Sequence, residues 1–179
     1  MKIRVKTQPT TEPVSVSTVK EYLRIDGTFS DTQLSSLITA GRQMAENFTN
    51  ISIAEQVIEL AFDHYPPNAI SLPKGPIKSV DAITLTDVDG VTSSVLTSSY
   101  VIDYFDSRIV KKASAVHPVV TLQESNGFVV EYTAGFDEVP EAIKEAIILY
   151  IKGQYDCVPA EEYINSFKTL LYPYKVVSV

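Results

Sequence analysis

The spacing of apolar residues changes twice along this chain, and these changes constrain its fold more than any other feature. Residues 31–49 place apolar side chains at helical intervals, whereas residues 56–62 alternate in the way that a half-buried strand does. Helical spacing returns after Pro140. The pattern predicts an α+β fold: a helical bundle of about four helices, with an antiparallel β layer inserted between the second and third long helices.

Capping residues and prolines indicate where the helices begin and end. Asp31 is a suitable cap for the clearest helix, and Pro140 suits the first position of the next long one. The predicted helices span residues 15–25, 31–49, 140–155 and 159–171, and the predicted β region spans residues 53–136. Residues 15–171 are expected to form a single domain. They follow an N-terminal arm at residues 1–14, which contact with a partner would order, and precede a C-terminal tail at residues 172–179.

A proline-rich corner lies inside the β region, at Leu72–Val80. Pro73 and Pro76 interrupt strand pairing because proline has no N–H donor, and Gly75 between them tolerates a positive φ. Apolar residues on both sides fit flanking strands. A proline-rich ligand for a partner domain would need an extended, exposed segment, so we interpret the corner as a rigid turn between two strands.

Composition narrows the range of functions. The 179 residues carry a formal net charge of −7, and residues 120–179 contain nine acidic against four basic side chains. Such an acidic surface repels phosphate backbones, which argues against sequence-specific DNA or RNA binding. Cys157 is the only cysteine, so no intrachain disulfide forms, and a reducing cytosolic origin fits. No apolar stretch approaches the roughly 20 residues that span a bilayer, and none follows the basic N-terminus, so we expect a soluble protein without a membrane partner.

Side chains suited to catalysis or metal binding are few. Asp87 and Asp89 suggest the start of a calcium loop, but such a loop needs a late glutamate, and Asp-Gly is a strong hairpin signal. His64 and His117 have no histidine or cysteine at ligand spacing, and the sequence contains no Gly-x-Ser-x-Gly motif. The sequence does not exclude a catalytic triad assembled from distant residues. We predict no catalytic residue, no metal and no cofactor.

Five short strings stand in a fixed order along the chain. They are Val19–Asp26 (VKEYLRID), Leu72–Val80 (LPKGPIKSV), Val130–Phe136 (VEYTAGF), Val139–Ala146 (VPEAIKEA) and Leu170–Lys175 (LLYPYK). In this order, and over about residues 16–176, the chain resembles the head-tail connector (adaptor) proteins of tailed bacteriophages. It departs from the family in having no tryptophan, and it has His117-Pro118 where the family often has Trp-Pro. These departures affect packing aromatics rather than function.

The resemblance implies a structural virion protein rather than an enzyme. Connectors of this family form a ring, dodecameric in our expectation, that lies under the portal protein, presents a surface to the next neck or tail component and lines the DNA exit channel. The implied partners are further copies of the chain, the portal, a downstream neck or tail-terminator protein and passing double-stranded DNA. The implied location is the neck of the virion, and the host cytoplasm during assembly. A monomeric tail-completion protein or other binding module is the alternative, followed by a hydrolytic enzyme.

Two contact surfaces are expected. The first is a C-terminal segment for portal docking, where the core has little room for apolar residues; it comprises Tyr172, Pro173, Tyr174, Lys175, Val176, Val177 and Val179. Folding of this segment back onto its own core is the alternative. The second consists of Ile3 and Val5, which would contact a neighbouring subunit by extending its sheet. Much of the net charge of −5 in residues 120–179 is expected to face the lumen of the channel or its rim, because an acidic wall has few cations to replace the counterions of DNA.

Overall fold

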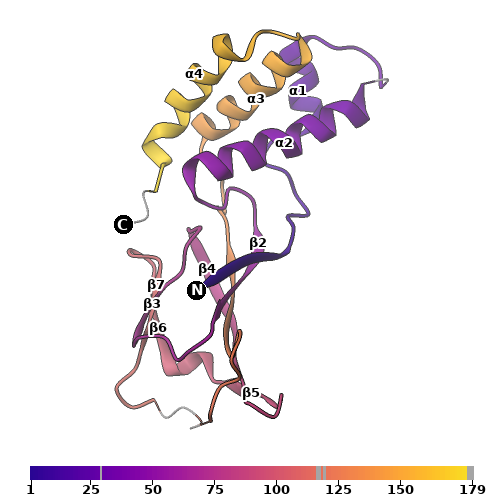
Figure 1. Ribbon diagram of the computed structural model, residues 1–179. Coiled ribbons are helices and arrows are strands. Elements are labelled where there is room, and N and C mark those ends of the chain that lie inside the picture. Colours follow the sequence, from indigo (N-terminus) through magenta and orange to yellow (C-terminus); the bar gives the residue numbers. More distant parts are fainter. Residues whose placement is uncertain (29, 116–117, 119, 177–179) are drawn as a thin grey trace. The chain divides into compact units, whose positions relative to one another are not determined.

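The chain folds into two compact units, whose elements are drawn in Figure 1. The computed structural model describes residues 1–28, 30–115, 118 and 120–176. The β unit consists of Met1–Gln8 and Glu55–Gly135, and the helical unit consists of Pro9–Ala54 and Phe136–Val179. Each unit has its own hydrophobic core. The predicted α+β fold is confirmed: the described residues form four α-helices and eight strands, seven of which lie between α2 and α3 in the sequence.

The helical unit contains α1 (Val16–Leu23), α2 (Asp31–Thr49), α3 (Glu141–Tyr155), α4 (Ala160–Leu171) and the short 3-10 helix η2 (Tyr172–Tyr174). Ser15 caps α1, since its hydroxyl accepts a hydrogen bond from the Thr18 N–H at 3.1 Å. Asp31 is the first helical residue of α2 rather than its cap, and Pro140 is the cap of α3 rather than its first residue. Across the described parts of the chain, the helices fall short of the length and hydrophobicity that crossing a membrane requires.

The apolar faces of the helices form the core of the helical unit. The buried core residues are Val14, Val19, Leu34, Ile38, Ala45, Ile51, Ile53, Ile143, Ala146, Ile147, Ile148, Ile151, Phe167 and Leu171. Gly153 allows α3 and α4 to pack closely against each other. A Cβ on Gly153 of α3 would lie 2.4 Å from Cδ1 of Tyr163 in α4, so the tyrosine ring occupies the space that any side chain at this position would need.

A buried ion-pair network lies on α2. The helical pattern places Arg42 near the polar side of this helix, yet its side chain is only 2% exposed. Its Nε and Nη1 donate hydrogen bonds to Glu12 and Glu46, both at 2.8 Å. Glu46 also accepts a hydrogen bond from the Ile53 N–H at 2.9 Å, and the Ile53 carbonyl accepts one from the Phe136 N–H at 3.3 Å. The network therefore holds all three chain segments that connect the helical unit to the β unit.

The β unit contains two antiparallel sheets. The five-stranded sheet has the order β1 (Lys2–Thr7), β2 (Gln56–Phe62), β8 (Phe128–Ala134), β4 (Ile77–Thr86), β5 (Thr92–Val95), and the three-stranded sheet has the order β3 (Ala69–Ser71), β7 (Arg108–Lys111), β6 (Tyr100–Asp103). A short 3-10 helix, η1 (Thr97–Ser99), precedes β6. Alternate residues of β2 and β8 are buried, as the period-two pattern predicts.

The core of the β unit includes buried residues from both sheets. They are Ile58, Leu60, Ile70, Leu72, Ile77, Ile83, Leu85, Val95, Tyr100, Ile109, Phe128, Val130, Tyr132 and Ala134. Burial raises the pKa of Tyr100 to about 12, and it raises the pKa of Tyr132 as well. Both hydroxyls therefore stay protonated at neutral pH.

Residues 2–7 belong to the chain's own sheet. β1 pairs antiparallel with β2, so that Ile3 lies opposite Leu60 and Val5 lies opposite Ile58. The expectation that a partner orders the arm does not hold for these residues, because β2 supplies their pairing within the chain. β1 stands at the end of the strand order, so its outer side is an edge of the sheet.

The corner at Leu72–Val80 is a turn between two strands, as predicted, since it connects β3 to β4. The positive φ falls on Lys74, at +59°, and not on Gly75. Gly75 instead leaves space for Ser107: a Cβ at position 75 would lie 2.7 Å from the Ser107 Oγ, so the serine hydroxyl would have to rotate away. The Leu72 N–H donates a hydrogen bond to the Ser107 carbonyl at 2.8 Å. The corner is thus fixed against the turn between β6 and β7.

Candidate interaction surfaces

Asp87 and Asp89, which were considered for metal binding, lie in the turn between β4 and β5. Asp87 Oδ1 accepts hydrogen bonds from the N–H groups of Asp89 at 3.0 Å and Val91 at 2.9 Å, which closes the turn between β4 and β5. His64 is exposed just after β2, and His117 lies outside the described residues. Within the described ranges, His, Cys, Asp and Glu side chains form no group of three or more that could hold a metal ion.

The C-terminal segment folds back, in part, onto the helical unit. Tyr174 packs against the helical core. The Lys175 Nζ lies 4.9 Å from the centre of the Phe48 ring, a cation–π distance. The Val176 N–H donates a hydrogen bond to the Thr49 carbonyl at 2.8 Å. Three of the predicted docking residues therefore have contacts within their own chain.

Tyr172 and Pro173 are the exposed start of this segment, and Tyr172 is 70% exposed. They lie beside an open hollow of about 550 Å³ at the end of α4. The hollow is lined by Asn165, Lys168, Thr169, Tyr172 and Pro173. The three α4 residues were not among the predicted docking residues, although their spacing places them on one helical face. Val177 and Val179, the remaining predicted docking residues, lie outside the described residues.

β1 presents basic side chains at alternate positions, which places them on one face of the sheet. The ion pairs are Lys2 with Asp63 at 3.4 Å, Arg4 with Glu59, and Lys6 with Glu131. The hydrogen bond from Arg4 lowers the pKa of Glu59, and the hydrogen bond to Glu131 raises the pKa of Lys6. Ile3 and Val5 alternate with these cations and belong to the opposite face. Ile3 is 41% exposed, so this apolar face is incompletely covered at the edge.

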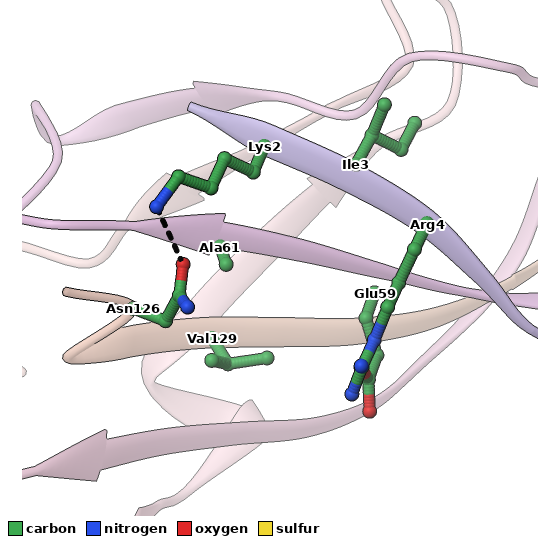
Figure 2. Close-up of a pocket in the computed structure, with 7 residues that line it drawn as sticks. All are labelled: Lys2, Ile3, Arg4, Glu59, Ala61, Asn126 and Val129. Atoms are coloured by element: carbon green, nitrogen blue, oxygen red, sulfur yellow. Dashed lines mark hydrogen bonds and ion pairs between the residues drawn. The ribbon is translucent and has the colours of Figure 1, made fainter.

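A cavity opens beside β1, and we name it the β1 cavity (Figure 2). Its volume is about 200 Å³, and it is lined by Lys2, Ile3, Arg4, Glu59, Ala61, Asn126 and Val129. Figure 2 shows Lys2 and Arg4 at its two ends, with Ala61 and Val129 between them. Lys2 Nζ donates a hydrogen bond to Asn126 Oδ1 at 3.3 Å, which holds one end of the cavity in place.

Tyr104 and Phe105, in the turn between β6 and β7, form an exposed pair that we name the aromatic tip. Tyr104 is 60% exposed and Phe105 is 102% exposed. The turn itself is held by Asp103, which accepts hydrogen bonds from the N–H groups of Phe105 at 3.1 Å and Asp106 at 3.3 Å. Arg108 Nε donates to the same carboxylate at 2.9 Å and lowers its pKa. Two adjacent aromatic residues in a turn are the sequence signal for this feature.

The described residues thus present three exposed features: the aromatic tip, the basic edge strand β1, and the start of the C-terminal segment at Tyr172. Comparison with protein families matches residues 12–156 to the head completion protein family. The chain belongs to this family. The predicted resemblance to phage head-tail connectors and the prediction of a structural protein rather than an enzyme are confirmed, because the family is one of head completion proteins. A search of curated proteins finds no match.

Solved structures with the same fold come from gene transfer agent (GTA) particles. A chain from the neck of an empty GTA particle computed with C6 symmetry is 21% identical, with a TM-score of 0.81. A chain from the virion of a native GTA particle is 19% identical (TM-score 0.79), and one from the neck of a native particle computed with C12 symmetry is 20% identical (TM-score 0.78). Each match covers 100% of this chain and 97% of the other. The fold is therefore shared over the whole length.

Proposed function

We propose that the chain is a subunit of a homo-oligomeric ring in the neck of a virion, where it connects the head to the tail. The observation that carries the proposal is the full-length fold match to two neck chains, from structures computed with C6 and C12 symmetry. Cyclic symmetry repeats one subunit around an axis, which is the arrangement of a ring, so this match supports the proposal. We take the ring to be a dodecamer that assembles in the host cytoplasm and joins the portal to a downstream neck or tail-terminator protein.

Native mass spectrometry of the full chain, alone and with its portal protein, tests the ring. We expect a dodecamer of the chain on the portal. A complex with a single copy of the chain would favour a monomeric tail-completion protein instead. Absence of any portal complex would contradict the connector function itself.

The ring is also proposed to line the DNA exit channel. Eight of the nine acidic side chains in residues 120–179 are exposed, and Glu131 is half-buried. An exposed acidic wall releases few counterions from DNA, so DNA passes without being held. Cryo-electron microscopy of the assembled neck checks this point: acids of Asp137–Glu162 on the outer wall of the ring would contradict it.

Portal docking is assigned to the C-terminal segment, beginning at Tyr172. Its support is the exposed Tyr172 ring beside the open hollow of α4. Removal of residues 173–179 should abolish capsid binding, but it also removes the packing of Lys175 on Phe48. Tyr172→Ala leaves that packing in place and should weaken capsid binding without changing the thermal unfolding temperature. Tyr22→Ala is the matched control, since Tyr22 is a 48% exposed tyrosine on α1 of the same unit.

Full capsid assembly by the truncated chain would contradict the docking role. A shorter truncation, of residues 177–179, separates the two parts of the segment. If only the shorter truncation is tolerated, docking depends on residues 173–176. If both truncations fail, the last three residues are required.

The edge strand β1 is proposed to contact the neighbouring subunit through Ile3 and Val5. Ile3 is 41% exposed and Val5 is half-buried, so both residues leave apolar surface uncovered at the edge of the sheet. Ile3→Lys should reduce oligomer formation measured by sedimentation velocity, because it places a charge in this surface. Unchanged oligomer formation by Ile3→Lys would remove this residue from the interface.

A further inference from the structure

The aromatic tip and the β1 cavity match in size and polarity. An apolar cavity of about 150 Å³ is large enough to hold a benzene molecule. The β1 cavity, at about 200 Å³, therefore has room for one phenyl ring. Ala61 and Val129 give it an apolar floor, as Figure 2 shows. Phe105 is the most exposed of the large hydrophobic side chains among the described residues.

The exposed charges of the two surfaces also differ in sign. The side chains of Lys2 and Arg4, at the ends of the cavity, are 58% and 76% exposed, whereas their acidic partners Asp63 and Glu59 are only 36% and 13% exposed. The cations are therefore the more exposed members of these pairs, and a phenyl ring placed between them would gain cation–π attraction. At the tip, Asp103 and Asp106 both pair with Arg108, and the Asp106 side chain is 62% exposed. An acidic tip thus complements a cavity whose ends expose cations.

Hydrogen bonds within the chain hold the backbone of the tip. The Asp103 carboxylate accepts two backbone N–H bonds within the turn, and the Ser107 carbonyl is bonded to the Leu72 N–H. A single exposed phenylalanine is ordinary on a protein surface. An exposed phenylalanine on a turn that side-chain hydrogen bonds already hold loses little conformational freedom on burial, which is the property of an interface anchor.

We propose that Phe105 of one copy of this chain inserts into the β1 cavity of the next copy. This inference rests on the proposed ring and supplies one of its subunit contacts. The tip and the cavity are different surfaces of the β unit, so the contact is heterologous: each copy gives its tip to one neighbour and its cavity to the other. Contacts of this kind close into a ring when the rotation between copies closes.

Photo-cross-linking tests the contact directly. Phe105→p-azidophenylalanine keeps the phenyl ring and adds a group that forms a covalent bond on irradiation. We expect irradiation of the concentrated full-length chain to give dimers whose cross-linked peptide contains Ala61 or Val129. Leu96→p-azidophenylalanine is the control, because Leu96 is 74% exposed on the same unit and lies outside the proposed contact. The control should lose these dimers.

A cavity variant provides the second measurement. Ala61→Leu fills the β1 cavity and should cause a loss of cross-linking from position 105, whereas Ala69→Leu, on exposed β3 surface, should not. Circular dichroism checks that both variants are folded. Absence of dimers, attachment to peptides outside the cavity, or insensitivity to Ala61→Leu would each overturn the proposal. None of these results would affect portal docking, which is measured separately through Tyr172.

Discussion

The helical unit and the β unit differ in whether their paired cations are buried or exposed. In the helical unit, Arg42 is almost completely buried and is bonded to two carboxylates. In the β unit, the cations of β1 remain 45% to 76% exposed although each has an acidic partner. Breaking a buried pair leaves an unpaired charge in the interior, whereas an exposed pair contributes little to stability. The comparison indicates that buried charge fixes the chain path in the helical unit, whereas exposed charge in the β unit lies along the edge strand that we propose as a contact surface.

Arg42→Ala should have the largest effect on stability. It leaves Glu12 and Glu46 without their shared cation, and breaking such a pair costs roughly 3–5 kcal/mol of unfolding free energy. Urea denaturation followed by circular dichroism measures the loss. A loss no larger than that of an exposed arginine would show that water replaces Arg42, and the proposed contrast between the units would then fail.

Gly153→Ala comes next. The added Cβ would lie 2.4 Å from the Tyr163 ring, and overpacking of this kind costs about 1–3 kcal/mol. The same denaturation experiment detects it. The double variant Gly153→Ala/Tyr163→Leu should recover part of the loss, because the smaller side chain leaves the ring's space free. Equal losses in the single and double variants would locate the strain elsewhere.

Acid should weaken the attachment of β1. The hydrogen bond from Arg4 holds the pKa of Glu59 below its usual 4.5, so the carboxylate stabilises the folded chain above that pH. This contribution is lost as the pH falls through the lowered pKa of the folded state. Comparison of the native sequence with Glu59→Gln by denaturation across pH should show a difference above pH 4.5 that disappears in acid. A constant difference would exclude ionisation as its cause.

Arg4→Ala should have the smallest effect on stability. The Arg4 side chain is 76% exposed, and exposed pairs typically contribute about 0.2–1 kcal/mol. The loss should shrink further in 1 M salt, where the Debye length is about 3 Å. Denaturation at low and high salt measures both effects. A loss comparable with that of Arg42→Ala would contradict the division between the two units.

Local pattern is enough to predict α2 but not β1. The 19 residues of α2 repeat their apolar positions over several turns, so its range, Asp31–Thr49, follows from the sequence. β1 is short, and its pairing partner Glu59 lies 55 residues away from Arg4. Nothing near Lys2–Thr7 indicates that partner, because strand pairing depends on tertiary structure.

The candidate surfaces were predicted only in part, for related reasons. The burial of Arg42 depends on Glu12, which is distant in the sequence and reaches α2 only in the folded chain. The sequence identifies Tyr172 as a candidate, but the contact of Lys175 with Phe48 requires the packed helices. The exposure of Phe105 follows from a turn held by Asp103, and apolar residues are buried often enough that sequence alone favours the opposite expectation.

The hydrogen bond between the Phe136 N–H and the Ile53 carbonyl has a consequence for protein engineering. It places the two ends of the residue 55–135 insertion next to each other on the helical unit, so a short peptide could join Ala54 to Phe136 in place of the whole insertion. β1 would then lose its pairing partner and become an unpaired leader. The insertion therefore holds every strand of the β unit except β1, which precedes the helices in the sequence. A different β layer grafted onto these helices would have to supply a new pairing partner for Lys2–Thr7.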